Sequence, residues 1–543
     1  MTIDNPTNVE ELARSLQEPL LSRQLARVDD RDNDAERDGI VINVNTNDGV
    51  GGGSDDSEDQ EIRPLCDGLK LKDSVLIKSL YFLDALGSSA WGRFSAIYYN
   101  NHGLNTQQIG LIEGLRTFTP TISSVFWGFI ADRFRCRKQV WVWTKSGGTS
   151  ILLLLALPYV TQSFYRILWV SVAAQLFVTN GAILDAYTLE LLGTENKLFY
   201  GRYRLYASLS WGLGSIVMGW VTDHYGFDWN FIMFGALSLL MILLVAYCIP
   251  DTINDDNSTR QDPTTADRNR SREEMDVEDE AAADGDEFGE MSDLLLLVMK
   301  PRVLFFLIEV IVMGAAMATV ERLLFLYMVN DLSASTLLCG LSVGVNVLFE
   351  LPIFWYASSI LNYLGSDGMF LLSMTCFVVR VYGYTLLTPS TKWWILPLES
   401  MHGVTFATFW IVTTDVSKIL IDESKGGVWS TTIPSVVQML YTSVGATIGS
   451  VLGGFAMHRF GSRAMYLFTA ESVLCMLLVH LVGSILARTC CRQIESLLPG
   501  CPHQVGQVVE NVNNGDDDSE QDGEQDGERE EDLSISGEST TST

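Results

Sequence analysis

Four ionisable residues stand inside otherwise apolar runs of the sequence: Glu350, Arg380, Glu399 and His402. Such a side chain costs several kcal/mol in hydrocarbon unless it pairs with an opposite charge or faces a cavity. Glu399 and His402 are three residues apart, which puts both on one face of a helix. These residue types and spacings predict a polar site inside a membrane, where a proton or a polar solute can bind.

Arg380, Glu399 and His402 have the combination that proton coupling needs. A carboxylate that is charged in one state and neutral in another must change either its burial or its distance from a cation. At a rise of about 1.5 Å per residue, Arg380 falls at a depth between Glu399 and His402. We assign proton coupling to these three residues. The residues alone leave open a permanent structural ion pair between Arg380 and Glu399.

Glu350 and Trp410 are candidates for binding a solute. An ionised carboxylate accepts hydrogen bonds and cannot donate them, which suits a polyhydroxyl solute. Pro352, two residues after Glu350, frees a backbone carbonyl and predicts a kink beside it. Trp410 follows His402 by about two helical turns, and its ring could stack on a ring of the solute. Packing between helices is the alternative for both side chains.

The elements that must position these residues are about twelve predicted membrane helices. A run of about 20 mostly apolar residues is long enough as a helix to cross a hydrocarbon core of about 30 Å. Such runs begin near Val75, Thr106, Val140, Tyr165, Tyr200, Trp229, Val303, Leu337, Gly368, Trp393, Gly427 and Ala464. A soluble buried helix explains one such run but not twelve. We therefore predict an all-α integral membrane protein.

The twelve runs form two groups of six. We predict an N-terminal six-helix bundle over residues 75–250 and a C-terminal six-helix bundle over residues 293–488, the layout of transporters made from two repeats. Small residues that let helices approach closely recur at one spacing in both groups. They are Gly214-Ser215, Gly219 and Gly226 in the fifth run, and Gly449-Ser450, Gly454 and Gly461 in the eleventh.

Three acidic segments lie outside the bundles, at residues 1–74, 251–292 and 489–543. They account for essentially all of the net charge of −30. Their Asp, Glu, Ser, Gly and Asn, with few aromatic residues, form a composition that cannot bury enough apolar surface to fold. We expect disordered tails and a disordered linker, and cytosolic partners are one role open to them.

Positive charge in the short loops sets the orientation, because such loops face the cytosol. Lys and Arg gather after the second, fourth and tenth runs. Both termini and the acidic linker are therefore expected in the cytosol. The membrane itself is undecided between the plasma membrane and an endomembrane such as that of a vacuole or endosome.

Charges at the cytosolic ends of the runs are candidates for gates. Asp132 and Arg133 end the second run, and Asp185 near the end of the fourth could pair with Arg202 or Arg204. Ion pairs close to water are easily broken and remade. Glu321-Arg322, near the outer end of the seventh run, could close the outer side or merely extend to the membrane surface. Four more charges leave substrate contact and packing equally open: Asp84, Arg93, Glu113 and Arg116.

Several motifs resemble the major facilitator superfamily. The segment Gly128-Phe129-Ile130-Ala131-Asp132-Arg133-Phe134-Arg135-Cys136-Arg137-Lys138 resembles its signature between the second and third helices, with Arg135 where a second glycine is usual. Three more motifs are similar to the branch that contains lactose permease, nucleoside permease and the major facilitator superfamily domain-containing protein 6 relatives. They are Tyr200-Gly201-Arg202-Tyr203-Arg204-Leu205, Glu350-Leu351-Pro352 and His402-Gly403-Val404-Thr405-Phe406.

The resemblance implies proton-coupled symport of a small polar solute, sugar-like or nucleoside-like, by alternating access across a lipid bilayer. In lactose permease an arginine of the ninth helix and a histidine and glutamate of the tenth form the corresponding site, which matches Arg380, His402 and Glu399 here. The histidine and glutamate come in the opposite order in this sequence, which leaves their individual roles open. The position of Glu350 matches a glutamate that accepts hydrogen bonds from substrate hydroxyls.

A non-transporting receptor or scaffold on the same fold is the competing function, because a fold does not fix a function. The costly charges inside the apolar runs favour transport. Neither a phosphate-binding loop nor a nucleophile motif indicates an enzyme, and nothing in the sequence predicts a nucleic-acid partner or a cofactor. The nine cysteines are scattered and predict neither a metal cluster nor a disulfide framework.

Overall fold

The computed structural model describes residues 65–66, 69–179, 181–193, 196–249, 296–424 and 429–497. The chain divides into two units, residues 1–62 and 63–543, and all the described residues belong to the second. Most of the N-terminal segment, the whole linker 251–292 and residues 498–543 therefore lie outside the described residues, and their predicted disorder stays a prediction.

The N-terminal half consists of helices, preceded by a two-residue antiparallel ladder of β1 (Leu65–Cys66) and β2 (Leu69–Lys70). Its long helices are α2 (Leu71–Trp91), α4 (Thr106–Arg133), α5 (Arg137–Leu153), α9 (Tyr200–Tyr225) and α10 (Asp228–Cys248). Its short helices are α3 (Ser95–Asn101), α6 (Pro158–Thr161), α7 (Phe164–Gln175) and α8 (Ala182–Leu192).

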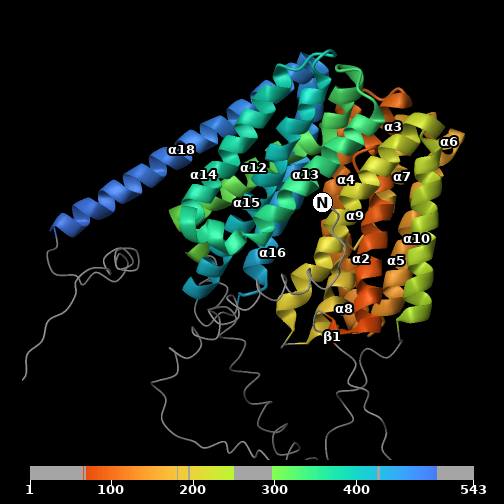
Figure 1. Ribbon diagram of the computed structural model, residues 1–543, viewed down its shortest axis with the longest axis horizontal. Helices are drawn as coiled ribbons and strands as arrows, with labels where there is room; N and C mark the ends of the chain where they lie inside the picture. The colour runs from red at the N-terminus through yellow and green to blue at the C-terminus, as the bar shows by residue number, and fades with distance from the viewer. Residues whose placement is uncertain are drawn as a thin grey trace, which may run out of the picture. The chain divides into compact units, whose positions relative to one another are not determined.

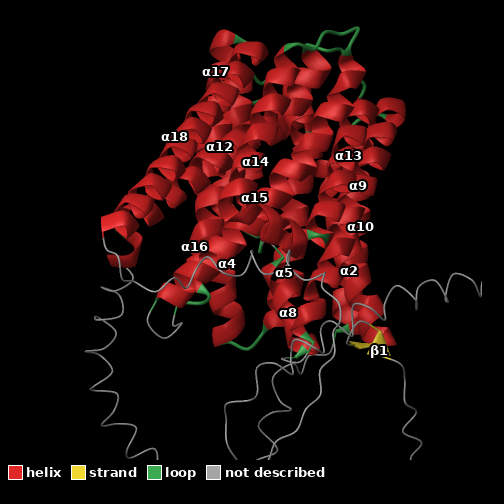
Figure 2. Cartoon of the chain, turned by 60° about the vertical axis from the view of Figure 1, so that its left-hand side comes forward, coloured by secondary structure: helices red, strands yellow, loops and turns green. Residues whose placement is uncertain are grey.

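The C-terminal half lies beside the N-terminal half, green to blue against red to yellow in Figure 1. Figure 2 shows how completely both halves are helical. The C-terminal helices are α12 (Pro301–Asn330), α13 (Thr336–Trp355), α14 (Ala357–Thr385), α15 (Ile395–Glu423), α16 (Thr432–Met439), α17 (Ala446–Phe460) and α18 (Ser462–Leu497). A π-helical segment, Leu440–Gly445, joins α16 to α17.

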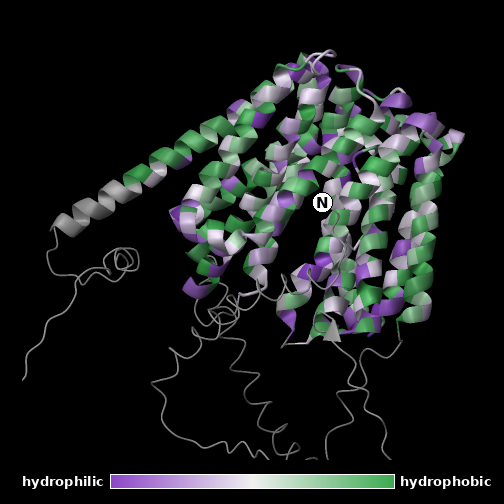
Figure 3. Cartoon of the chain, in the orientation of Figure 1, coloured by the Kyte–Doolittle hydropathy of each residue, from purple (hydrophilic) through white to green (hydrophobic). Residues whose placement is uncertain are grey.

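Seven of the described helical segments are long and apolar enough to cross a membrane. They are α10 and the six segments built on α12, α13, α14, α15, α16 with α17, and α18. Figure 3 shows α10 hydrophobic over most of its length, and its exposed side chains include Ile232, Leu239 and Leu243. The other predicted runs also contain helices, but these are more polar or shorter: α5 has 17 residues, and the fourth run is divided into α7 and α8.

The repeated glycines of the fifth and eleventh runs occupy equivalent places in the two halves. Gly226 and Gly461 both end their helices with a φ of 86°, a conformation that glycine adopts without strain. A side chain on Gly219 would meet the carbonyl oxygen of Thr336 at the start of α13. One on Gly454 would meet the carbonyl oxygen of Thr106 at the start of α4. The repeat read from the sequence thus corresponds to two related helix contacts between the halves.

The halves meet at the end of the bundle that carries α3, which we call the α3 end; the opposite end, which carries β1 and β2, is the β1 end. At the α3 end Asp223 of α9 accepts hydrogen bonds of 2.8 Å from the backbone N–H groups of Thr336 and Leu337. This carboxylate caps the N-terminus of α13, a site that favours negative charge. Asn100 and Asn330 also bond across the interface, with a distance of 3.2 Å from Nδ2 of Asn100 to Oδ1 of Asn330.

The fourth predicted helix is broken between α7 and α8. Gly181 has a φ of 75° and ends the helical path at this point. The freed backbone carbonyls are satisfied from α4: the Ser123 hydroxyl donates to Val178 (2.7 Å), and the indole N–H of Trp127 donates to Leu176 (2.7 Å). A break at membrane depth is stable only when protein covers it or when it borders a cavity.

Candidate functional site

Arg380 of α14 and His402 of α15 lie side by side, both buried. A guanidinium N–H of Arg380 donates to Nδ1 of His402, and Nε2 of His402 lies 3.4 Å from a carboxylate oxygen of Glu321 on α12. Because Nδ1 accepts from a permanent cation, the imidazole in this arrangement is neutral and carries its hydrogen on Nε2. His402 therefore connects a cation on one side to a carboxylate on the other.

Glu321 continues this chain of contacts into the N-terminal half. Its carboxylate lies 3.6 Å from the guanidinium of Arg93, which follows α2. The polar chain from Arg93 through Glu321 and His402 to Arg380 thus crosses the interface between the halves. A relative movement of the halves must stretch or break it.

Glu399 lies one turn before His402 on α15, and its side chain is fully buried. Oε1 accepts a hydrogen bond from the hydroxyl of Tyr384, whereas Oε2 has no partner among the described residues. Tyr384 is held in place by Tyr327, whose hydroxyl donates to its carbonyl oxygen at 2.6 Å. A buried carboxylate oxygen without a partner is costly, so Oε2 is an unusual polar atom in this site.

Arg380 and Glu399 do not form a direct ion pair among the described residues, so the permanent pair considered from the sequence is absent from this structure. Tyr384, one turn after Arg380, connects them instead. The guanidinium lies 5.9 Å from the centroid of the Tyr384 ring, and the Tyr384 hydroxyl donates to Glu399. Arg380 and Glu399, both assigned to proton coupling from the sequence, are therefore connected through a tyrosine that has no counterpart in that assignment.

Glu350 lies on α13 at the level of His402. A side chain on Gly403 would meet the backbone N of Glu350 at 2.6 Å, so α13 and α15 are in close contact there. The Glu350 carboxylate is within electrostatic range of Glu321 and Arg93. One turn earlier, Asn346 is buried, and its amide has no hydrogen-bond partner in the described part of the chain. α13 thus brings a carboxylate and a buried amide close to α15.

Trp410 ends a column of rings along α15. His402 and Phe406 stack nearly parallel with centroids 6.2 Å apart, and Phe406 meets Trp410 at 6.1 Å. Tyr441, in the π-helical segment, packs against Trp410 at 5.4 Å. The indole nitrogen of Trp410 is buried and has no acceptor among the described residues. π-Helical segments are frequent at functional sites because they displace one side chain from the regular register.

Glu113 forms a second charged group beside the first. Its side chain is 1% exposed, and its two oxygens face Arg116 of the same helix (2.5 Å) and Arg322 of α12 (3.4 Å). Ser95 bonds to both Glu113 and Arg116 at 2.8 Å. One carboxylate thus joins cations from both halves near the α3 end.

The residues predicted as gates lie at the β1 end. Asp132 pairs with Arg137 at 3.0 Å, and Arg137 also pairs with Glu190 of α8 at 3.2 Å. These contacts tie α4, α5 and α8 together within the N-terminal half. Arg133, the last residue of α4, is exposed.

Asp185 also lies at the β1 end, and its carboxylate bonds to a tyrosine. Asp185 accepts a hydrogen bond of 2.6 Å from the hydroxyl of Tyr81 on α2. Arg204 lies 3.4 Å from the hydroxyl of Tyr200, and the guanidinium of Arg202 packs over the ring of Phe199. Whether these residues act as gates remains a hypothesis.

We expect Asp132→Asn to slow uptake about fivefold without reducing the amount of folded protein. Asp132 is 67% exposed here and pairs, among the described residues, within its own half, so its gating contact would belong to the state that is closed at the β1 end. Loss of an exposed ion pair worth about 0–1 kcal/mol would shift the population away from that state by up to about fivefold. Thiol labelling of a cysteine placed on α8 measures the accessibility of the β1 end, which should increase. The control is Asp422→Asn, because Asp422 is an exposed carboxylate near the last residue of α15, also at the β1 end. Unchanged labelling and uptake would remove the gating role of Asp132.

The sequence analysis missed three members of the site: Tyr384, Arg93 and Glu321 as a partner of His402. The signal for Glu321 and Arg93 was their charge within apolar runs, whereas a tyrosine in a membrane helix gives no comparable signal. Among the described residues, no group of three or more His, Cys, Asp and Glu side chains could hold a metal ion. The site is therefore one of charges, hydroxyls and aromatic rings.

Known proteins share this architecture. Residues 75–468 match the MFS_1 like family. The human "Major facilitator superfamily domain-containing protein 6-like" is 23% identical over 168 residues, which are 31% of this chain and 27% of that protein. The sucrose permease of Escherichia coli is 23% identical over 177 residues, 30% of this chain and 41% of the permease. The chain thus aligns with less than half the length of these relatives.

The crystal structure of the nucleoside transporter NupG superposes with a TM-score of 0.61 at 14% identity, covering 75% of this chain and 98% of NupG. At this identity the likeness shows the fold alone. The family match covers most of the chain, and it agrees with the fold class and the family resemblance predicted from the sequence, which are both confirmed. The chain is an all-α membrane protein with the major facilitator fold and belongs to the MFS_1 like family.

Proposed function

We propose that the protein is a secondary transporter that carries a small polar solute together with a proton by alternating access. The observation that carries this proposal is the buried Glu399 carboxylate, with one oxygen bonded to Tyr384 and the other without a partner among the described residues. A protonated carboxyl is neutral and fits this position. Among the described residues, no cation forms an ion pair with Glu399.

Proton transfer is coupled to movement through the polar chain described above. Arg380 donates a hydrogen bond to His402 and also lies over the ring of Tyr384, whose hydroxyl bonds to Glu399. When the halves move apart at the α3 end, Arg93 moves away from Glu321, which stays with His402 in the C-terminal half, and the contacts around Arg380 rearrange. Arg380 is then free to approach the Glu399 carboxylate and stabilise its charged form, which releases the proton.

The solute binds beside the polar chain that runs from Arg93 to Arg380, and its contacts are Glu350 and Trp410. Glu350 offers a carboxylate, Asn346 offers an amide that has no partner among the described residues, and the column of rings that ends at Trp410 offers a flat apolar surface. This combination suits a sugar-like or nucleoside-like molecule, which has hydroxyls on one part and an apolar face on another. The named substrates of the sucrose permease and of NupG agree with that class.

The orientation follows the loop charges. The β1 end, where Arg133, Arg137 and Lys138 lie, is assigned to the cytosol, and the α3 end to the opposite side. The structure, with its halves joined at the α3 end, then represents a state that is closed to the outside.

Uptake into proteoliposomes containing the full chain tests this function. Radiolabelled sugars and nucleosides are supplied with and without an inward proton gradient, and we expect at least one class to accumulate only with the gradient. Glu350→Gln should weaken solute affinity about tenfold or more, because a hydrogen bond to a charged group contributes about 1.5–3 kcal/mol. Exchange of solute at equal pH measures that affinity.

Asp331→Asn, at the exposed end of α12, is the matched control and should leave affinity unchanged. Absence of uptake for every class, from protein that is monodisperse and folded, would favour a receptor or scaffold instead. Equal uptake with and without the proton gradient would support transport but contradict proton coupling.

A further inference from the structure

A cavity of about 350 Å³ lies inside the N-terminal half, apart from the site that contains Glu350, Trp410 and Arg380. Its walls come from α2, α4, α5, α9, α10 and the break between α7 and α8, and Arg322 of α12 closes one end. The volume is within the range of pockets that hold small organic molecules. The proposed symport makes no use of it.

The break in the fourth membrane segment creates this cavity. Phe177, Val178, Thr179 and Gly181, which replace a regular turn of helix, all line it. Ser123 and Trp127 supply hydrogen bonds to the displaced backbone, so the break is built into the packing of α4. Broken membrane helices are characteristic of the binding sites of transporters.

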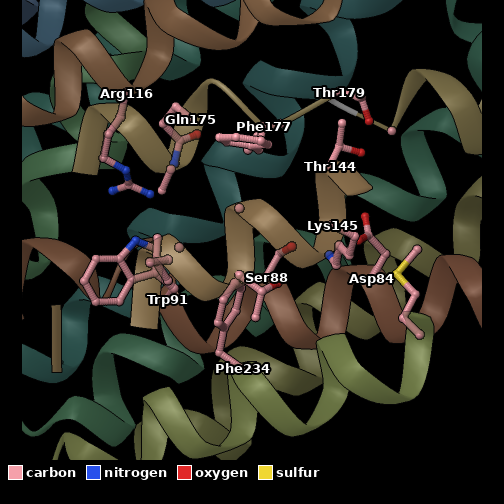
Figure 4. Close-up of a pocket in the computed structure, with 18 of the residues that line it drawn as sticks. Asp84, Ser88, Trp91, Arg116, Thr144, Lys145, Gln175, Phe177, Thr179 and Phe234 are labelled. Atoms are coloured by element: carbon pink, nitrogen blue, oxygen red, sulfur yellow. The ribbon is translucent and has the colours of Figure 1, made fainter. Parts of the chain in front are cut away.

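Two buried donors on the wall have no acceptor. They are the indole N–H of Trp91 and the Nε–H of Arg116, both without a partner among the described residues. Figure 4 shows Arg116, Trp91 and Gln175 gathered at one end of the cavity. A buried donor left unpaired costs about 1–3 kcal/mol, and each of these needs an oxygen acceptor. A ligand that brings such oxygens is the simplest source.

The charges around the cavity favour an anion. Lys145, Arg116 and Arg322 line it together with one carboxylate, Asp84, which pairs with Lys145 at 2.6 Å. Glu113 lies behind and faces both arginines. One positive charge is therefore left uncompensated, and a ligand with a single negative charge would neutralise it.

The middle of the cavity is aromatic. Phe177 and Phe234 face it from opposite walls in Figure 4, with Trp211 also in the lining. Aromatic side chains pack well against flat rings. We propose that this cavity is a second ligand site, which binds a small aromatic monocarboxylate. Its carboxylate accepts hydrogen bonds from Trp91 and Arg116, and its ring lies between Phe177 and Phe234.

Benzoate is the probe for this site, with benzamide as the neutral analogue of the same shape. The thermal midpoint of the purified full chain should rise with benzoate concentration and not with benzamide. Trp91→Phe keeps the ring and removes only the N–H, so it should weaken benzoate binding about tenfold or more. Trp169→Phe, at an exposed tryptophan of α7 outside the cavity lining, is the matched control and should change affinity less than twofold. Ser88→Leu, which fills the cavity, should abolish the shift.

Arg116→Lys serves as a second variant, since it retains the charge and removes the Nε donor; it too should weaken benzoate binding. An equal response to benzamide would overturn the assignment of an anion site. If Trp91→Phe and Ser88→Leu both bind benzoate as tightly as the parent chain does, the ligand lies outside this cavity. Loss of benzoate binding in Glu350→Gln would lead to the same conclusion. No shift at millimolar benzoate would also overturn the proposal.

Discussion

Glu399→Gln is expected to abolish accumulation of solute driven by a proton gradient while solute exchange continues. Glutamine still accepts the hydrogen bond from Tyr384 through its amide oxygen, so the contact and the packing of α15 are preserved. What is lost is the ability to take up and release a proton at Oε2, which has no other partner among the described residues. Uptake with and without a pH gradient, and exchange at equal pH, measure the two activities in one preparation.

Glu471→Gln is the matched control, because Glu471 is an exposed glutamate on α18, outside the charged group, and should behave like the parent chain. A second comparison comes from Tyr384→Phe, which removes the hydroxyl that bonds Glu399 and should lower coupled uptake about tenfold. If Glu399→Gln accumulates solute under a gradient as well as the parent does, Glu399 is a structural residue and the proton is carried elsewhere.

Helical periodicity and depth predicted much of this site but not its contacts. They brought Arg380 and His402 to similar levels, and the structure places them in direct contact. They could not decide which neighbour each group would meet, since several side chains on adjacent helices share a depth. Tyr384, one turn after Arg380, occupies the space in which an ion pair with Glu399 was considered.

The position of Glu321 shows how an error in a helix boundary changes a residue's role. The sequence analysis placed Glu321 near the outer end of its helix, from which it could reach the membrane surface. α12 instead continues to Asn330, nine residues further, so Glu321 lies about 13 Å inside the end of the helix. It therefore faces His402 and Arg93 in the interior.

The sequence contains a signal for the break in the fourth membrane segment, but the high hydropathy of the segment conceals it. Asn180-Gly181 is a turn sequence, yet the surrounding residues are apolar enough to read as one continuous run. By contrast, the two-half architecture was readable from the repeated glycines, because close helix contacts in a membrane demand small residues. Gly226 and Gly461 have the same φ of 86°, which is in keeping with that interpretation.

The same kind of contact makes the closure of the α3 end sensitive to a single residue. A side chain on Gly110 of α4 would lie 2.5 Å from the carbonyl oxygen of Ser450 and 2.8 Å from Cα of Gly454. Both are backbone atoms of α17 in the other half, so no side-chain rotation relieves the overlap. Only separation of α4 from α17 makes room.

Gly110→Leu is therefore expected to open the α3 end and to stop net transport. Overpacking costs about 1–3 kcal/mol, which shifts a two-state population about fivefold to 150-fold. In a chain whose other cysteines are replaced, Cys339, which is buried on α13 beside the closed interface, should become reactive toward a membrane-impermeant thiol reagent. Gly128→Leu is the control on the same helix, since nothing lies within 4 Å of its Cβ position. Parent-like labelling and turnover in Gly110→Leu would show that α4 and α17 need not close on each other during transport.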